Sequence, residues 1–161
     1  MMGILEKTMS NMKLSKFELN IECKKIIEAL NTKQASSRFV GGFVRNYINN
    51  TNTKDIDIAT QLSPDEVIDI LSKVKIRVIP TGIKHGTVSA FINDQSFEIT
   101  TLRKEVRHDG RHSEVIFIDD WYEDASRRDF TINSIYINQN GEIYDPFNGI
   151  EHLNEKRIIF I

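Results

Sequence analysis

A short stretch in which acidic and apolar residues alternate constrains the fold of this chain more than any other feature. From Asp55 to Thr60 the sequence reads DIDIAT, the two-residue period of a strand with one buried face. Asp55 and Asp57 therefore leave the same face of that strand, about 6.5–7 Å apart along the backbone. Two carboxylates so placed can converge on one metal ion, and oxygen ligands suit Mg²⁺. Taken alone, the pair fits exposed surface carboxylates better.

The segment just upstream adds an anion site to that pair. The predicted order is a strand over residues 37–40, a turn at Gly41 and Gly42, and a helix from residue 43 to 48. Backbone without side chains at a helix N-terminus binds anions such as phosphate. Arg45 would add a charge-assisted contact there. The alternative is a tight turn with a surface arginine.

The rest of the chain predicts helices and strands in mixed order. Helices are predicted at 15–31, at 64–74 behind a Ser63 capping box, and at 121–136 behind Asp119 or Asp120. Strands are predicted at 76–79, 87–92, 96–102 and 142–145, with 87–92 and 96–102 forming a hairpin, and 103–113 is predicted to be a loop. Because the two kinds of element do not alternate strictly, the predicted class is α/β or α+β around a mixed sheet flanked by helices.

Composition restricts the compartment and the partners. Cys23 is the only cysteine, so no internal disulfide forms and a reducing, cytoplasmic location is the expectation. No run of 18 apolar residues occurs, so neither a signal peptide nor a membrane span is expected. The formal net charge of −2 lacks the basic excess of a domain that grips nucleic acid unaided. Any RNA contact must therefore be local or made elsewhere.

Several motifs together indicate a family. The run GGFVRNYINNTNTKDIDIAT resembles the signature of polymerase-β-like nucleotidyltransferases of the CCA-adding type. Further resembling segments follow in the same order: PTGIKHGTVSAF, FEITTLR, HDGRHSEV, RRDFTINSIY and YDPFNGIEHLNEKRI. The chain thus resembles, over about residues 39–158, the catalytic head domain of the bacterial tRNA nucleotidyltransferases of class II and poly(A) polymerases. The expected division is an N-terminal helical segment, 1–34, and a nucleotidyltransferase domain, 35–161.

This resemblance implies an activity and its partners. The chain would be an Mg²⁺-dependent enzyme that transfers a nucleoside monophosphate from CTP or ATP to an RNA 3′-hydroxyl, with pyrophosphate as the leaving group. The implied pathway is CCA addition to tRNA or poly(A) addition. The expected partners are a nucleoside triphosphate and RNA, with the tRNA 3′ end preferred, and no membrane.

The resemblance also implies roles for individual residues. Asp55 and Asp57 would hold the catalytic Mg²⁺ ions, and the nucleotide triphosphate would contact Gly41, Gly42, Arg45 and Arg128. Asp129 and Asn133 are four residues apart and therefore lie on one face of the predicted helix. By the resemblance this region would contact the ribose, and Asn133 could hydrogen-bond to the 2′-hydroxyl of that ribose. An ordinary polar helix residue is the alternative for Asn133.

Two further groups of residues remain open at this point. Glu98 lies on a predicted strand where it could face the Asp pair as a third carboxylate, binding metal or deprotonating the attacking hydroxyl; an exposed strand glutamate is the alternative. In the resembling enzymes a flexible loop helps to close the site, and it matches the segment with Arg107, Asp109, Gly110 and Arg111. A solvated basic loop is the alternative for that segment.

Rival functions also follow from the sequence. The chain ends at Ile161, where members of the family continue into a helical neck, so we expect either that a separate polypeptide supplies neck and body domains or that the chain is a fragment. The main rival is therefore an inactive or partner-dependent head from a split or decaying gene. Asn46, at a position where the family usually has aspartate, also favours it. A third interpretation, a stand-alone nucleotidyltransferase for a protein or small molecule, leaves the motifs beyond the Asp pair unexplained.

Overall fold

The computed structural model describes residues 12–108 and 112–161 and consists mainly of one mixed sheet with helices around it. The strands are β1 (Ser37–Phe39), β2 (Asp55–Thr60), β3 (Arg77–Gly82), β4 (Thr87–Ile92), β5 (Gln95–Thr101), β6 (Arg103–His108), β7 (His112–Phe117), β8 (Tyr136–Ile137) and β9 (Ile143–Tyr144). The helices are α2 (Ile21–Leu30), α3 (Gly41–Ile48), α4 (Pro64–Lys73), α5 (Trp121–Ser126) and α6 (Gly149–Asn154), with 3-10 turns η1 (Ile83–His85) and η2 (Thr131–Asn133).

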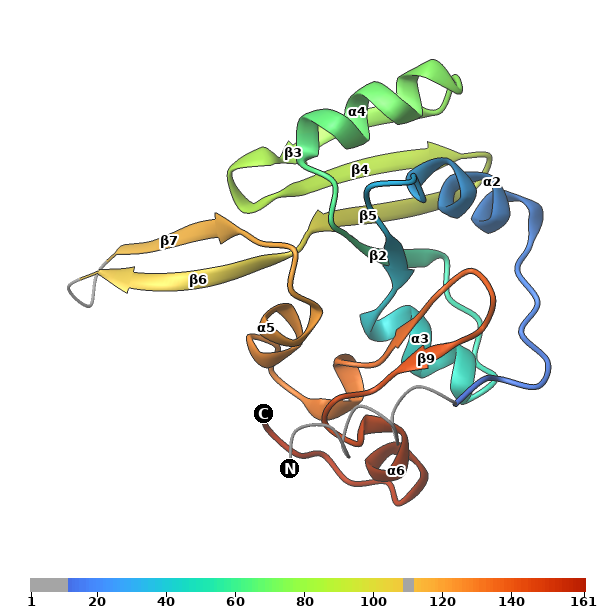
Figure 1. The fold of residues 1–161 in the computed structure, drawn as a ribbon. Helices are drawn as coiled ribbons and strands as arrows, with labels where there is room; N and C mark the ends of the chain where they lie inside the picture. Colours follow the sequence, from blue (N-terminus) through green and yellow to red (C-terminus); the bar gives the residue numbers. More distant parts are fainter. Residues whose placement is uncertain (1–11, 109–111) are drawn as a thin grey trace.

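The sheet has seven strands in the order β3-β4-β5-β2-β1-β8-β9, with β2 at its centre. Strands β2 and β5 run parallel, and the other neighbours run antiparallel. Helix α4 lies along β3 and β4, while the β6–β7 hairpin projects away from the body of the fold (Figure 1). The predicted class, a mixed sheet flanked by helices, is confirmed.

Alternation along the two central strands separates a core face from a polar face. Ile56 and Ile58 on β2, with Phe97 on β5, are at most 1% exposed and belong to the main core. Helices α2 and α4 pack into the same core, for example through Ile26 and Leu71. Because side chains alternate across a strand, Asp55 and Asp57 leave the opposite face.

A smaller apolar cluster covers part of that opposite face. It consists of Val40, Ala59, Leu102, Ala125 and Tyr136, all buried. Since Ala59 lies two residues beyond Asp57 on the same side of β2, the cluster fixes α5 next to the Asp pair.

Elements with strong local signals follow the prediction closely. Strands β2 and β4 have their predicted bounds. At α4 the capping box is confirmed: the Glu66 amide donates to Ser63 Oγ at 3.3 Å, and the Ser63 amide donates to Glu66 Oε2 at 2.8 Å. The hairpin of β4 and β5 is confirmed as well.

Three predicted elements are wrong in extent or kind. The first helix begins at Ile21 rather than Ser15, because Asn20 caps it by accepting a hydrogen bond from the Cys23 amide at 2.8 Å. Residues 103–108, within the segment predicted as a loop, form β6 and pair with β7, which begins at His112. The helix predicted over 121–136 ends at Ser126, and the chain beyond it bonds instead to the C-terminal segment, for example from the Thr131 amide to the Ile159 carbonyl at 3.0 Å.

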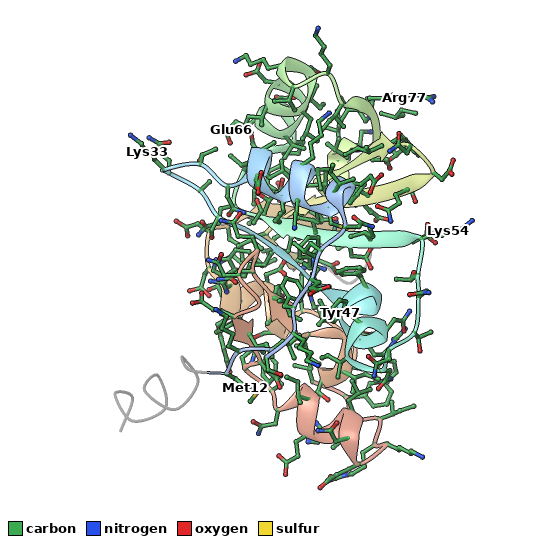
Figure 2. The ribbon with its side chains drawn as sticks, turned by 90° about the vertical axis from the view of Figure 1, so that its right-hand side faces the viewer. Met12, Lys33, Tyr47, Lys54, Glu66 and Arg77 are labelled. Carbon is green, nitrogen blue, oxygen red and sulfur yellow. The ribbon has the colours of Figure 1, made fainter. Side chains whose placement is uncertain are left out.

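The segment before α2 is attached to α3 through Tyr47. The Tyr47 hydroxyl donates to the Lys16 carbonyl at 3.1 Å and accepts from the Glu18 amide at 3.0 Å, and its ring packs edge-on against Phe17. In Figure 2 the exposed charged side chains of Lys33 and Lys54 project from the periphery, whereas Tyr47 lies in the interior of the view.

The structure also describes the environment of the single cysteine and the length of the helices. Burial raises the pKa of the Cys23 thiol to about 12, so the single cysteine stays protonated and unreactive at neutral pH. Within residues 12–108 and 112–161, no helix combines the length and the apolarity that crossing a bilayer requires.

Candidate nucleotide and metal site

Three carboxylates share the polar face of β2 and β5. The parallel register places Asp57 beside Glu98 and Asp55 beside Ser96, and residues in register on neighbouring strands point to the same face. Ser96 Oγ donates to Asp55 Oδ1 at 2.8 Å, which orients that carboxylate. The structure thus brings Glu98 to the Asp pair; Ser96, which the sequence analysis did not single out, supports it.

Negative charge is crowded around Asp57. Burial raises its pKa to about 6 and the charge of Glu98 adds to the rise, while Arg128 opposes it. A carboxylate with a raised pKa is short of compensating positive charge, which a divalent cation would supply. The hard oxygen donors of this face fit Mg²⁺ better than zinc. Among the described residues, however, no group of three or more His, Cys, Asp or Glu side chains is placed so that it could hold a metal ion.

The glycine pair lies directly against Asp57. Gly41 has φ +68°, a left-handed conformation that favours glycine, and a Cβ there would lie 3.3 Å from Asp57 Oδ2. The Val40 amide donates to the Asp57 carbonyl at 3.0 Å, which ties the turn to β2. Helix α3 begins at Gly41, two residues earlier than predicted, so its N-terminus stands beside the carboxylates. A helix N-terminus attracts anions.

Asn133 connects Arg45 to Asp129. Its Oδ1 accepts from Arg45 Nη1 at 2.7 Å, and its Nδ2 donates to Asp129 Oδ1 at 3.2 Å. The prediction that Asp129 and Asn133 share a helix is wrong, because Asn133 lies on η2, yet the two side chains do meet. A carboxamide can make up to four hydrogen bonds, so Asn133 could also bond to a ligand hydroxyl while it holds Arg45 and Asp129.

Arg128 is held by two buried residues that the sequence analysis missed. Its Nε donates to the Tyr136 hydroxyl at 3.0 Å, and its Nη2 lies 3.3 Å from Asp124 Oδ2. Asp124 and Tyr136 are both 0% exposed. The spacing Asp-x-x-Arg-Arg, which puts Arg127 and Arg128 three and four residues after Asp124, could have indicated this contact.

The basic residues predicted for a loop lie on the β6–β7 hairpin or beside it. Lys104 pairs with Glu123 at 3.4 Å, and Arg103 donates to the carbonyl of His85. The backbone of Arg107 pairs with that of Ser113 on β7. Asp109, Gly110 and Arg111 lie outside the described residues, so their role in closing the site stays a prediction.

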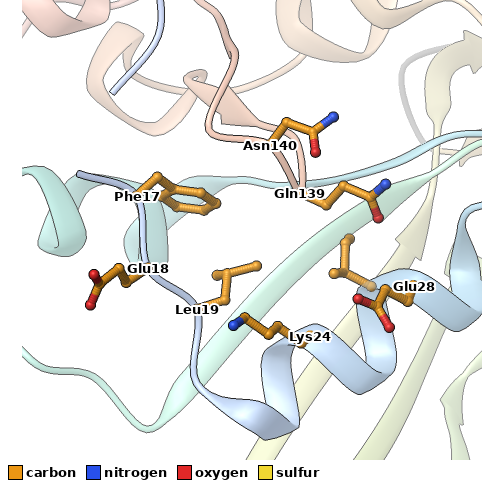
Figure 3. Close-up of a pocket in the computed structure, with 8 residues that line it drawn as sticks. Phe17, Glu18, Leu19, Lys24, Glu28, Gln139 and Asn140 are labelled. Atoms are coloured by element: carbon orange, nitrogen blue, oxygen red, sulfur yellow. The ribbon is translucent and has the colours of Figure 1, made fainter. Parts of the chain in front are cut away.

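A cavity of about 230 Å³ lies elsewhere on the molecule, between the segment before α2, α2 itself and the β8–β9 turn (Figure 3). Its walls are Phe17, Glu18, Leu19, Lys24, Ile27, Glu28, Gln139 and Asn140. None of the three carboxylates lines it. The carboxylate face is therefore a site separate from this cavity.

Comparison with known proteins identifies the family of this chain. The family model described as the poly A polymerase head domain matches residues 37–159. The human CCA tRNA nucleotidyltransferase 1, mitochondrial, is 42% identical over 139 residues, which are 86% of this chain and 32% of that protein. The CCA-adding enzyme of Anoxybacillus flavithermus is 44% identical over 135 residues, 83% of this chain and 33% of that enzyme. The chain thus spans about a third of the length of the curated relatives it matches.

Solved structures give the same result. The Bacillus stearothermophilus CCA-adding enzyme in complex with CTP is similar with a TM-score of 0.74 and 35% identity, over 86% of this chain and 32% of that one. A tRNA nucleotidyltransferase complexed with a primer tRNA and an incoming ATP analog is similar with a TM-score of 0.64 and 25% identity, over 83% of this chain and 37% of that one.

Proposed function

This chain belongs to the poly(A) polymerase head domain family, and we propose that it transfers a nucleoside monophosphate from CTP or ATP to the 3′-hydroxyl of an RNA. The proposed acceptor is the 3′ end of tRNA, since relatives are CCA-adding enzymes and one similar structure holds a primer tRNA. Poly(A) addition is the nearest variant, because the family name covers it as well.

One observation carries the proposal: three carboxylates meet a glycine turn and a helix N-terminus on one face. In the proposed reaction the 3′ oxygen bonds to the α-phosphorus, the bond from that phosphorus to the bridging oxygen of the β-phosphate breaks, and pyrophosphate leaves. Asp55 and Asp57 would hold Mg²⁺, which would supply stabilisation of the negative charge that develops in the transfer. Glu98, in register with Asp57, would either accept the proton of the attacking hydroxyl or join the metal site, in which case that proton would pass to water.

The triphosphate fits the positive side of the same face. The N-terminus of α3 offers backbone amides, and Arg45 Nη2 lies 3.5 Å from the Cβ position of Gly42. Arg128 lowers the pKa of Asp57, so its charge also reaches this face. Two arginines and a helix N-terminus therefore oppose the charge of the phosphates. A cytoplasmic location and a separate polypeptide with neck and body domains stay predictions of the sequence.

A transfer assay tests the proposal. The purified chain is incubated with Mg²⁺, labelled CTP or ATP, and tRNA that ends before its CCA, and products are resolved at single-nucleotide length. We expect incorporation that falls by about 10³-fold or more in the Asp55→Ala/Asp57→Ala variant, because several kcal/mol of charge stabilisation is removed.

The acceptors and one control separate the outcomes of this assay. Comparison with the same tRNA carrying a finished CCA end distinguishes CCA addition from tailing. Incorporation that persists in the double variant would contradict the proposed site. No incorporation despite Mg²⁺-dependent nucleotide binding would support a head that needs a partner instead.

A further inference from the structure

We propose that Asp124 and Tyr136 are positioning residues that fix the guanidinium of Arg128 toward the triphosphate site. This inference rests on the proposed function, because it concerns the residues that hold Arg128, which the proposed function places at the phosphates. Among the described residues, Asp124 and Tyr136 hydrogen-bond to Arg128 and not to Asp55, Asp57 or Glu98. Their effect would therefore be exerted through Arg128.

The three side chains form a closed triangle. Tyr136 donates its hydroxyl hydrogen to Asp124 Oδ2 at 2.7 Å and accepts from Arg128 Nε at 3.0 Å. Arg128 Nη2 closes the triangle at the same Asp124 oxygen, at 3.3 Å. A guanidinium held through two of its nitrogens has its plane fixed. Within the part of the chain that the structure describes, Nη1 of Arg128 makes no hydrogen bond, so it is free to bind a ligand oxygen.

The charge on Asp124 is shared between two arginines. Its Oδ1 accepts from Arg127 Nε at 3.0 Å and from the Arg103 amide at 3.2 Å. Burial alone would raise the pKa of Asp124, but Arg128 and Arg127 hold it below its usual value, so the carboxylate stays ionised. The guanidinium groups of Arg127 and Arg128 carry two positive charges and Asp124 carries one negative charge, so the three groups together have a net charge of +1. That excess charge lies where it opposes the negative charge of Asp57.

The triangle is attached rigidly to the site. The Tyr136 ring packs edge-on against Trp121 with centroids 5.4 Å apart. Tyr136 also belongs to the apolar cluster with Ala59, which lies two residues beyond Asp57 on β2. Packing of this kind holds a side chain in one rotamer. The direction of Arg128 relative to Asp57 is therefore set by buried groups rather than by solvent.

The test uses Tyr136→Phe, which removes only the bridging hydroxyl, with Tyr144→Phe as the matched control. The Tyr144 ring packs near that of Tyr136, at 5.9 Å, but its hydroxyl makes no hydrogen bond to the described residues. In nucleotide-free protein, the rate at which the Arg128 Nε hydrogen exchanges with solvent, measured by NMR, reports whether the hydrogen bond to Tyr136 is intact. We expect faster exchange in Tyr136→Phe and Asp124→Asn and no change in Tyr144→Phe.

Titration with Mg²⁺-CTP then measures how the substitutions change the affinity for the nucleotide. We expect affinity to fall about tenfold in Tyr136→Phe. The loss should disappear in an Arg128→Ala background, since a residue acting through Arg128 has nothing to position there. A purely structural role would give the same loss in both backgrounds.

The outcomes separate this inference from the proposed function. Unchanged Nε exchange, or an affinity loss that persists without Arg128, would overturn the positioning role while nucleotide binding by the wild type stands. A wild-type chain that binds no Mg²⁺-CTP at all would overturn the proposed function, and the positioning role with it.

Discussion

Replacing Asp57 by asparagine is expected to make the metal-free chain more stable and to remove its activity. The Asp57 carboxyl has a pKa of about 6 when folded and about 3.9 when unfolded. The folded state therefore binds the proton more tightly, and ionised Asp57 destabilises the fold at neutral pH. After allowance for its partial exposure, Asp57→Asn should stabilise the chain by about 1–2 kcal/mol, or roughly 3–6 °C in Tm. The transfer rate should fall by about 10³-fold or more.

The stability gained by Asp57→Asn is expected to depend on pH. The penalty from Asp57 is absent below about pH 4, grows between about pH 4 and 6, and is complete above that range. Thermal unfolding in EDTA at pH 4 and pH 8 should therefore show the gain from Asp57→Asn at pH 8 alone. The control is Asp69→Asn, which removes an exposed carboxylate paired with Lys73. A variant that is less stable than the wild type at pH 8 would disprove the destabilisation by ionised, partly buried Asp57.

Replacing Gly149 by alanine is expected to cause the largest loss of stability. A Cβ at Gly149 would lie 2.2 Å from the Thr131 carbonyl oxygen and 2.8 Å from Ile135 Cγ1. Backbone cannot yield as a flexible side chain does, so the strain should cost about 3 kcal/mol, or roughly 6–12 °C in Tm. Because Thr131 opens η2, which carries Asn133, the affinity for nucleotide should fall too.

Gly82→Ala is the matched control for this second prediction. A Cβ at Gly82 would meet Thr87 Cβ at 3.4 Å, which is ordinary contact. Its change in stability should stay within about 1 kcal/mol. Equal Tm values for Gly149→Ala and the wild type would mean that α6 and η2 are not packed as closely as described.

The sequence predicted those parts of the molecule whose signal is local. The alternation along β2, the capping box of α4 and the glycine turn before α3 each depend on residues a few positions apart. The same holds for Asp55 and Asp57, whose common face follows from strand geometry alone. Glu98 was a candidate on weaker grounds, since only the parallel pairing of β2 and β5 brings it beside Asp57.

The errors occur where distant contacts decide the structure. Strand β6 is mostly charged and the hairpin lies outside the main core, so this part of the chain resembles a loop. The apolar residues Val115, Ile116 and Phe117 of β7 were a local strand signal that the prediction did not use. The helix predicted over 121–136 stops at Ser126 because the following backbone bonds to residues 159–161, which no local pattern reveals. For the same reason the role of Asp124 was missed: its hydrogen bond from Tyr136 joins residues on different elements.

Calorimetric titration of the chain with CTP and with ATP tests directly whether the carboxylate face binds a metal–nucleotide complex. It is run with Mg²⁺ and with EDTA, on the wild type, the Asp55→Ala/Asp57→Ala variant and an Asp69→Ala control. We predict binding that requires Mg²⁺, survives in the control and is lost in the double variant. Nucleotide binding of equal strength in the double variant, or none in the wild type, would contradict it.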